Sequence, residues 1–315
     1  MKNHEINIQG LDVILVRGSD AENFLQGQIT NDIKLLEKEN EAIYAGYCSP
    51  KGRLIAFFLI IKVWNNYFLF CPTSISDEIS KKLSMYILRS KVLLEKTPDN
   101  TSYFSFYGGS KSEEAFKNIW GDVPYPTKIM ETAQHPNEQN TTGLLSVTKL
   151  PGKNGRFLVI GESENIKMIY DEIFRNTDSP DEKSWNASDI EAKIPNIFKE
   201  TQDKFIPQSL NLDVLNAVNF KKGCYTGQEI VARTHYLGKS KRRMFQANLS
   251  INETFNIGDP IIANNDTVGQ VVNYCEIKPG LFQLLIELRL DQAESILLLK
   301  DNAVSINLSD LKLFK

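Results

Sequence analysis

The spacing of the apolar residues changes near residue 244, and this change constrains the fold more than any other feature of the chain. From Met244 to Leu308, short apolar runs alternate with turn residues, as at 258–260 (Gly-Asp-Pro) and 279–280 (Pro-Gly). Short, closely spaced strands with Gly and Pro between them are typical of a small all-β barrel or sandwich. We therefore expect residues 244–315 to form a C-terminal β-barrel.

The residues before this point mix strands and helices. Their apolar patterns predict strands at 11–17, 43–48, 53–63 and 67–71, a helix at 75–88, and a loop at 121–143. A chain of 315 residues is long enough for two or three domains. We expect an α+β protein with α/β domains at 1–100 and 101–205, a linker at 206–243, and then the barrel.

Composition and cysteine usage argue against several classes of protein. The chain is 42% hydrophobic and 24% charged, as expected of a soluble globular protein. Its longest apolar run, Leu54 to Ile61, has eight residues, whereas a membrane-spanning helix needs about 20. The four cysteines form no C-x-x-C pair and the chain has three histidines, so we expect no metal site. We expect a cytoplasmic protein with reduced thiols and no membrane partner.

Positive charge is concentrated between residues 221 and 243, although the whole chain carries a net charge of −3. This basic strip holds one acid, Glu229, and seven basic residues: Lys221, Lys222, Arg233, Lys239, Lys241, Arg242 and Arg243. Seven positive charges less one negative charge leave a local charge of +6. Such a strip suggests an anionic ligand or a nucleic-acid backbone, and the alternative is a solvated loop.

Residues 222–229, Lys-Gly-Cys-Tyr-Thr-Gly-Gln-Glu, form what we call the cysteine loop. Cys224 lies between Gly223 and Gly227, and glycine allows positive φ and a close approach to a ligand. Positive charge from Lys222 favours the thiolate form of Cys224. We therefore predict a functional thiol that acts as a nucleophile, as a redox centre, or as a ligand to a transiently held metal or cluster. The alternative is a small residue that packs a tight turn.

Two common classes of site find little support in the sequence. A Cys–His hydrolase would need a histidine base, and His235, eleven residues after the thiol, is the candidate nearest in sequence. Neither G-x-x-x-x-G-K-[ST] nor G-x-G-x-x-G occurs, which argues against nucleotide hydrolysis and dinucleotide binding.

Trp185 and Glu191 form a possible site for a flat cofactor. A tryptophan face can stack on a heteroaromatic ring, and a carboxylate can accept two parallel hydrogen bonds from an amino-pyrimidinone edge, which a pterin has. The alternative is a core tryptophan and a surface glutamate.

Four segments resemble the YgfZ family of folate-binding proteins linked to tRNA modification. Residues 205–233 resemble the signature region of that family, and residues 18–32 resemble its G-x-D-A-x-x-F-L-Q-G-Q-x-T-x-D motif. Pro-Lys-Gly-Arg at 50–53 fits its P-K-G-R turn, and residues 185–192 fit its W-x-x-x-x-I-E-A stretch. The resemblance spans nearly the whole chain.

The resemblance implies a relation to the glycine-cleavage T-protein, with folate-binding α/β domains around a central opening and a C-terminal β-barrel. It also implies binding of tetrahydrofolate and a role in maintaining iron–sulfur enzymes, including one that thiomethylates tRNA. Folate and such client enzymes are therefore the expected partners. By the same resemblance Cys224 is the functional thiol, with Lys222 beside it, and the expected folate contacts are Trp185, Leu11, Glu191, Gly223, Tyr225, Gln228 and Glu229.

Two departures from this pattern bear on activity. Residues 53–57 carry no carboxylate, whereas T-protein enzymes place one there for aminomethyl transfer, and Leu11 stands where some bacterial members have tryptophan. The missing proton-handling group favours an accessory protein over a methylene transferase. The alternatives are a folate-dependent one-carbon transferase and a protein that binds tRNA directly through the basic strip, and the sequence leaves open whether the chain catalyses a reaction.

Overall fold

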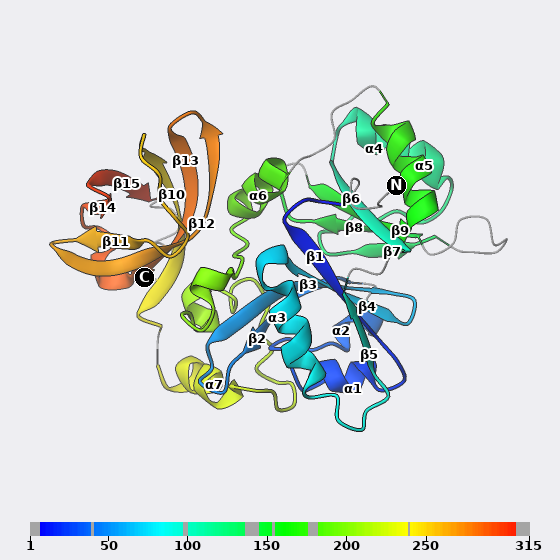
Figure 1. Ribbon diagram of the computed structural model, residues 1–315, viewed down its shortest axis with the longest axis horizontal. Coiled ribbons are helices and arrows are strands. Elements are labelled where there is room, and N and C mark those ends of the chain that lie inside the picture. Colours follow the sequence, from blue (N-terminus) through cyan, green and yellow to red (C-terminus); the bar gives the residue numbers. More distant parts are fainter. Residues whose placement is uncertain are drawn as a thin grey trace. The chain divides into compact units, whose positions relative to one another are not determined.

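The computed structural model of the chain has a mixed α+β architecture (Figure 1), which confirms the predicted fold class. It describes residues 7–38, 41–96, 100–135, 145–152, 155–175, 182–238 and 240–306. The chain divides into two compact units. The first comprises Met1–Leu25, Ile33–Ile43 and Leu59–Trp185, and the second comprises Gln26–Asp32, Tyr44–Phe58 and Asn186–Lys315. The domain boundaries expected from the sequence stay predictions.

The first sheet has five strands in the order β2 (Ile43–Cys48), β3 (Leu54–Val63), β4 (Asn66–Pro72), β1 (Leu11–Arg17) and β5 (Leu93–Lys96). The strands predicted from the apolar pattern are present. β3 is buried along nearly its whole length, as an unbroken apolar run of strand length predicts. β3 and β4 pair as an antiparallel hairpin, and β1 pairs antiparallel with both β4 and β5. The short helices α1 (Ala21–Gln26) and α2 (Leu35–Lys38) follow β1.

Helix α3 (Thr73–Ser84) packs against β1, β4 and β5. Ile75, Ile79 and Leu83 recur at helical spacing and form its buried face. The prediction that this helix continues to residue 88 is wrong. Leu88 is 88% exposed and has a φ of 48°, so the apolar residues after Leu83 find no core to pack against and the helix ends.

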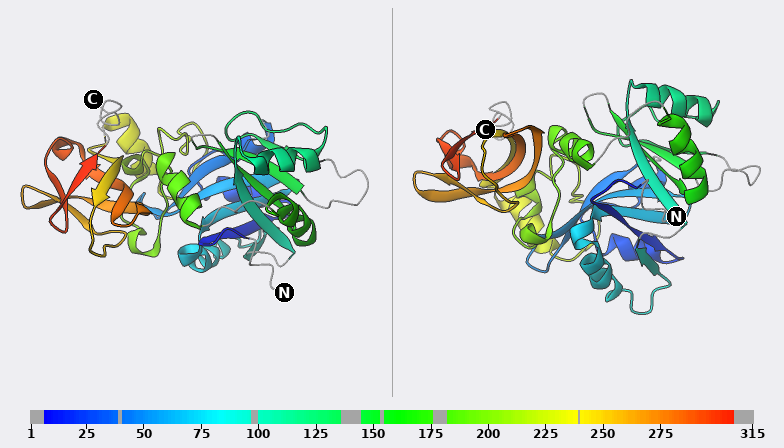
Figure 2. Two further views of the ribbon diagram at one scale, coloured as in Figure 1. Left: turned by 90° about the horizontal axis from the view of Figure 1, so that it is seen from above. Right: turned by 45° about the horizontal axis from the view of Figure 1, so that its top comes forward.

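The second sheet has the order β6 (Thr101–Tyr107), β9 (Arg156–Glu162), β8 (Leu145–Leu150) and β7 (Thr132–Gln134). Helices α4 (Lys111–Trp120) and α5 (Ser163–Ile173) pack together on the sheet (Figure 2). The core between them and the sheet is rich in aromatic residues. The predicted loop at 121–143 is wrong where β7 forms. β7 is polar, and a buried hydrogen bond of 2.9 Å between the hydroxyls of Thr132 and Thr148 joins it to β8. Residues 136–144 lie outside the described residues.

The C-terminal strands close into a barrel, which confirms that prediction (Figure 1). Its order is β10 (Arg242–Ser250), β13 (Leu281–Arg289), β12 (Asp266–Lys278), β11 (Pro260–Ala263), β14 (Leu297–Leu299) and β15 (Asn302–Ile306), and the short 3₁₀ helix η4 (Leu290–Gln292) follows β13. On β10, the side chains of Phe245, Ala247 and Leu249 enter the barrel core. This period of two is what a strand with one buried face requires. Closure leaves no free edge in the sheet.

Between the second sheet and the barrel the chain forms α6 (Glu182–Glu191), the 3₁₀ helices η2 (Lys199–Thr201) and η3 (Pro207–Leu210), and α7 (Gln228–Leu237). The sequence pattern did not predict α7, which begins inside the cysteine loop. Gly227, at its N-cap, has a φ of 80°, a conformation in which glycine is favoured. No helix within the described part of the chain is long and apolar enough to cross a membrane.

Candidate functional site

Lys222 anchors the cysteine loop through its ammonium group. The side chain is only 9% exposed, and its Nζ donates hydrogen bonds to the carbonyl oxygens of Gln26 (2.8 Å), Ile29 (2.6 Å) and Asn31 (2.8 Å). An ammonium has three donors and no acceptor, so three carbonyl oxygens satisfy it fully. Lys222 therefore ties the loop to the segment 26–31, which lies 191 to 196 residues earlier in the chain.

Burial lowers the pKa of Lys222 to about 8, and the charge of Asp32 opposes this shift. The ammonium points into the cage of carbonyl oxygens described above. Its partners in the structure are therefore backbone oxygens of the segment 26–31, and a role beside the Cys224 thiol stays a prediction.

The segment that receives Lys222 is itself fixed by buried polar side chains. The Thr30 hydroxyl donates to the carbonyl oxygen of Ala217 (2.6 Å) and accepts from the amide of Gly46 (2.8 Å). The side-chain amide of Asn31 donates to the carbonyl oxygen of Asn216 (2.8 Å). Buried polar groups stabilise a fold when each has a partner, so these two residues hold the segment rigidly against the residues that precede the cysteine loop.

Two glycines bring the Pro-Lys-Gly-Arg turn into direct contact with the cysteine loop. A Cβ atom on Gly227 would lie 2.4 Å from the carbonyl oxygen of Ser49, and a Cβ atom on Gly52 would lie 2.7 Å from Cβ of Ile230. Both glycines have positive φ, 80° for Gly227 and 67° for Gly52. Any other residue would be strained and would push the turn and the loop apart.

The tip of the loop presents the thiol to solvent. Tyr225 is buried, with its ring centroid 5.2 Å from the Lys222 Nζ, and burial raises the pKa of its hydroxyl. Gly223 and Cys224, which lie between these two anchors, are exposed. A Cβ atom on Gly223 would meet no other atom within 4 Å, so the fold itself does not demand glycine there.

The other three cysteines differ from Cys224 in being buried. Cys48, Cys71 and Cys275 are buried, whereas Cys224 is exposed. Burial raises the pKa of the Cys48 and Cys71 thiols well above their ordinary value, which keeps these two groups protonated. Cys224 is therefore the cysteine that a partner can reach.

His235 lies on α7 and is engaged with aromatic rings. Its imidazole stacks on Phe220 with a centroid distance of 3.7 Å and an interplanar angle of 12°, and Tyr236 packs edge-on against it. These contacts give the imidazole a packing role and supply no support for a Cys–His hydrolase. Among the described residues, no three side chains of His, Cys, Asp or Glu lie close enough together to hold a metal ion.

Gln228 and Glu229 form the start of α7. The backbone N–H of Gln228 donates to the carbonyl oxygen of Tyr225 (3.2 Å), and the side chain of Gln228 is half-buried. Glu229 is exposed in the first turn of the helix, where a negative charge interacts favourably with the helix dipole. The structure thus brings Lys222, Gly223, Cys224 and Tyr225 together with these two residues on one anchored loop.

The predicted folate contacts outside the loop have different surroundings. Trp185 belongs to the first unit and is 8% exposed, because the Arg156 guanidinium covers its ring at 4.0 Å from the centroid. Leu11, in the same unit, begins β1 and its carbonyl oxygen accepts from the Tyr103 hydroxyl (2.5 Å). Glu191 ends α6 in the second unit and is exposed. Trp185 and Leu11 are therefore not in the unit that holds Cys224.

Asp203 is a residue of interest that sequence reasoning missed. Its carboxylate accepts a hydrogen bond of 2.6 Å from the Ser49 hydroxyl, at the Pro-Lys-Gly-Arg turn. It has a φ of 56°, which is unusual for a residue other than glycine. A carboxylate therefore reaches this turn from a segment about 150 residues later, and no local pattern in residues 53–57 could have indicated it.

The basic strip separates into two kinds of residue. Lys222 is caged by carbonyl oxygens, Arg242 is paired with Glu287 (2.7 Å), and Arg243 makes two hydrogen bonds to the Asp213 carboxylate (2.6 and 3.0 Å). The side chains of Lys221, Arg233 and Lys241 are exposed. Lys239 lies outside the described residues.

Comparisons with known proteins agree with this architecture. No protein-family model matches the chain. The tRNA-modifying protein YgfZ of Yersinia pestis (strain Pestoides F) is 32% identical over 249 residues, which cover 76% of this chain and 69% of that protein. The protein of the same name from Yersinia enterocolitica is 28% identical over 315 residues, covering 96% of this chain and 89% of that one.

A solved structure shares the fold at low sequence identity. The crystal structure of glycine cleavage system aminomethyltransferase T from Bartonella henselae superposes with a TM-score of 0.72 at 11% identity. The match covers 96% of this chain and 84% of that one. The T-protein-like fold expected from the sequence is therefore confirmed.

Proposed function

The chain belongs to the YgfZ family of tRNA-modifying proteins, and we propose that it supports tRNA modification as a folate-binding accessory protein that acts through Cys224. In this proposal its clients are iron–sulfur enzymes, among them an enzyme that thiomethylates tRNA. One observation carries the proposal: the exposed thiol lies at the tip of a loop whose flanking residues, Lys222 and Tyr225, are both buried.

An anchored and exposed thiol suits chemistry with a second macromolecule. The buried anchors fix the backbone on both sides of Cys224, so its sulfur is presented at little entropic cost when a partner binds. A cysteine thiolate is the usual protein ligand of iron in iron–sulfur clusters. Because Cys224 is the one exposed cysteine of the four, a client would have to supply the remaining cluster ligands.

The residues expected to hold a folate fit that role unequally. The Glu191 carboxylate is exposed and has no hydrogen-bond partner among the described residues, so it is free to accept two parallel hydrogen bonds from an amino-pyrimidinone edge. Trp185 fits less well, because Arg156 stacks on its ring and little of the side chain remains exposed. Folate recognition in this proposal therefore rests on Glu191 and does not require Trp185. A reduced folate, when bound, supplies a carrier for one-carbon groups.

The thiol is tested by complementation of cells that lack this protein. tRNA thiomethylation is measured in cells that carry wild type, Cys224→Ala or Cys275→Ala. We expect Cys224→Ala to lose at least about tenfold in thiomethylation, because a methyl group cannot take the place of the reactive sulfur. Cys275→Ala removes a buried thiol from the barrel and should rescue fully. Full rescue by a well-folded Cys224→Ala variant would remove the thiol from the mechanism.

The folate half of the proposal is tested by titrating the purified protein with tetrahydrofolate and following tryptophan fluorescence. We expect a saturable change in wild type and at least about tenfold weaker binding in Glu191→Gln, since the amide cannot accept both hydrogen bonds. Glu200→Gln, at another exposed glutamate of the same unit, is the matched control and should bind like wild type. If wild type shows no saturable change, the protein is not a folate binder of this kind.

A second candidate function, one-carbon transfer, is favoured by Asp203. Its carboxylate lies at the turn where residues 53–57 supply none, so a proton-handling group is available. The test is product formation from a methylamine donor and tetrahydrofolate, by wild type and by Asp203→Asn. Activity in wild type that Asp203→Asn loses would favour this function over the accessory role.

A further inference from the structure

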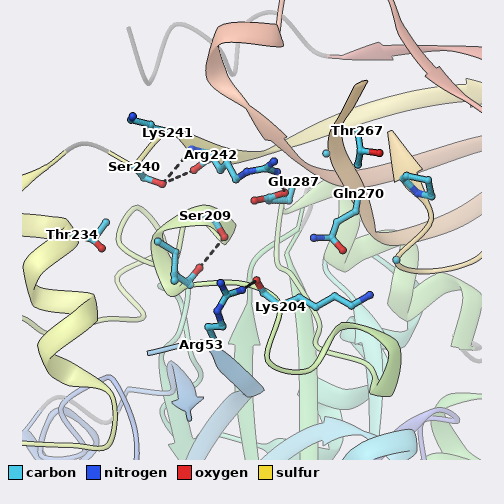
Figure 3. Close-up of a pocket in the computed structure, with 14 residues that line it drawn as sticks. Arg53, Lys204, Ser209, Thr234, Ser240, Lys241, Arg242, Thr267, Gln270 and Glu287 are labelled. Atoms are coloured by element: carbon cyan, nitrogen blue, oxygen red, sulfur yellow. Dashed lines mark hydrogen bonds and ion pairs between the residues drawn. The ribbon is translucent and has the colours of Figure 1, made fainter. Parts of the chain in front are cut away.

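A cationic cavity lies in the second unit, apart from the tip of the cysteine loop. Its volume is about 550 Å³, and its lining includes Arg53 from the turn at 50–53, Lys204, and Lys241 and Arg242 at the start of the barrel. Figure 3 shows Arg53 and Lys204 on one side, with Arg242 and Glu287 on the opposite side. Every lining residue belongs to the same compact unit.

The basic residues that line this cavity outnumber the acidic ones. The lining holds four cations, Arg53, Lys204, Lys241 and Arg242, and one carboxylate, Glu287, so its net charge is +3. Arg242 neutralises Glu287 through a contact of 2.7 Å, and Glu287 is 3% exposed. The positive charges that remain are therefore those of the other three residues.

All three of these residues are exposed, so a ligand can reach them. The Arg53 Nη1 donates to the carbonyl oxygen of Lys204 (2.6 Å), which fixes the guanidinium and leaves its other N–H groups available. The Lys204 Nζ lies 3.4 Å from where a Cβ of Gly258 would stand, so it reaches across to the barrel. In the described part of the chain, neither Lys204 nor Lys241 has a carboxylate within ion-pair distance of its ammonium group, and both are exposed.

The neutral lining indicates which part of a ligand is recognised. Its polar members are hydroxyl and amide side chains, including Thr267 and Gln270, and its lining contains no aromatic residue among those described. Arg, Lys, Ser, Thr and Gln are the side chains that contact phosphate and sugar oxygens in nucleic acids, whereas bases are commonly stacked on aromatic rings. The lining therefore suits a phosphate and its sugar better than a base.

We propose that this cavity binds the phosphate of a ribonucleotide unit. The volume lies within the range of about 300–1,000 Å³ that ligand pockets usually have, and it exceeds what a bare phosphate would fill. The same chemistry can come from two sources: a free nucleotide, or one phosphate–ribose unit of an RNA backbone. The proposal depends neither on folate binding nor on Cys224.

The first experiment compares uridine 5′-monophosphate with uridine by isothermal titration calorimetry at low salt. We expect binding of the monophosphate, and at least about tenfold weaker binding of uridine, because the three cations interact with the phosphate. Lys204→Glu should weaken monophosphate binding at least about tenfold. Lys278→Glu makes the same charge change at an exposed lysine of the barrel outside the cavity and should bind within about twofold of wild type.

The second experiment distinguishes the two sources with an unmodified tRNA transcript, its binding followed by fluorescence anisotropy. If Lys204→Glu weakens tRNA binding, and uridine 5′-monophosphate competes with the transcript, the ligand is an RNA phosphate. If Lys204→Glu weakens binding of the monophosphate alone, the ligand is a free phosphorylated molecule. In the RNA case, affinity should also fall steeply as salt is raised.

Any of three results would overturn the proposal. The first is equal affinity of wild type for uridine and its monophosphate, and the second is no binding of either the monophosphate or the transcript. The third is equal weakening by Lys204→Glu and Lys278→Glu, which would show a general charge effect. Tetrahydrofolate titration of the Lys204→Glu variant keeps this test separate from the proposed function, because folate binding should be unchanged.

Discussion

Two groups of basic residues within the strip 221–243 look alike in sequence and differ in structure. Lys222, Arg242 and Arg243 have partners inside the fold: three carbonyl oxygens, Glu287 and Asp213 respectively. Lys221, Arg233 and Lys241 are exposed. The first group fixes the cysteine loop and the start of the barrel, whereas the second is available to ligands.

This difference shows that local formal charge overstates the charge a ligand meets. Glu287 and Asp213 lie outside the strip in sequence, and they neutralise Arg242 and Arg243. Conversely, Arg53 and Lys204 lie outside the strip in sequence and join Lys241 at the cationic cavity. A functional account of the strip therefore has to separate anchoring residues from exposed ones.

The largest effect should come from Lys222→Met, which tests the anchoring group directly. The change removes the ammonium donor that three carbonyl oxygens share, and we expect it to lower the free energy of unfolding by about 4 kcal/mol. Lys221→Met, at the exposed neighbour, should change it by no more than about 0.5 kcal/mol. Urea unfolding of the three proteins measures both values. Equal effects at the two positions would abolish the distinction between anchoring and exposed lysines.

The two glycines of the cysteine loop allow the same comparison between a constrained and an exposed position, with a smaller expected change in the free energy of unfolding. Gly227→Ala puts a side chain at a φ of 80° and against the Ser49 carbonyl oxygen, and should lower the unfolding free energy by about 2 kcal/mol. Gly223→Ala meets open space and should leave it unchanged or raise it by a few tenths of a kcal/mol. Thermal unfolding compares the two variants.

Gly223→Ala then becomes informative about function. A variant that is fully stable but fails to support tRNA thiomethylation would show that a partner approaches the backbone beside Cys224. Normal activity would show that glycine at 223 is dispensable for both the fold and the partner.

Much of the fold could be predicted because its signals are local. The apolar run of β3 and the alternation along β10 each report burial on the strand that carries them. β7 escaped prediction because Thr132 and Gln134 are polar, and its stability comes from pairing with β8. The end of α3 escaped it because apolar residues continue in sequence past the last turn that finds a core.

The site was predictable only where its residues are contiguous. Cys224 and its two glycines stand within five residues and could be read as a loop that presents a thiol. The Lys222 ammonium is bound by carbonyl oxygens almost 200 residues earlier in the chain. The positive charge of the cavity comes in part from Arg53 and Lys204, which also lie outside the loop. Such contacts between distant segments leave no pattern in a single sequence.

The smallest predicted effect concerns the pH dependence of the anchor. The folded-state pKa of Lys222 is about 8, whereas its ordinary value is 10.5. Between these values the unfolded chain still holds the proton that the folded chain has released, so the contribution of Lys222 to the unfolding free energy rises with pH. Between pH 8 and pH 9 the difference in stability between wild type and Lys222→Met should grow by about 1 kcal/mol.

Urea unfolding of both proteins at several pH values measures this difference, because every other titratable group is the same in the two proteins. Burial disfavours the ammonium, whereas Asp32 and the three carbonyl oxygens favour it, so the sign of the slope reports which influence dominates. A difference that shrinks as pH rises would mean that the carbonyl cage outweighs burial. Lys222 would then stay charged in the folded protein at these pH values.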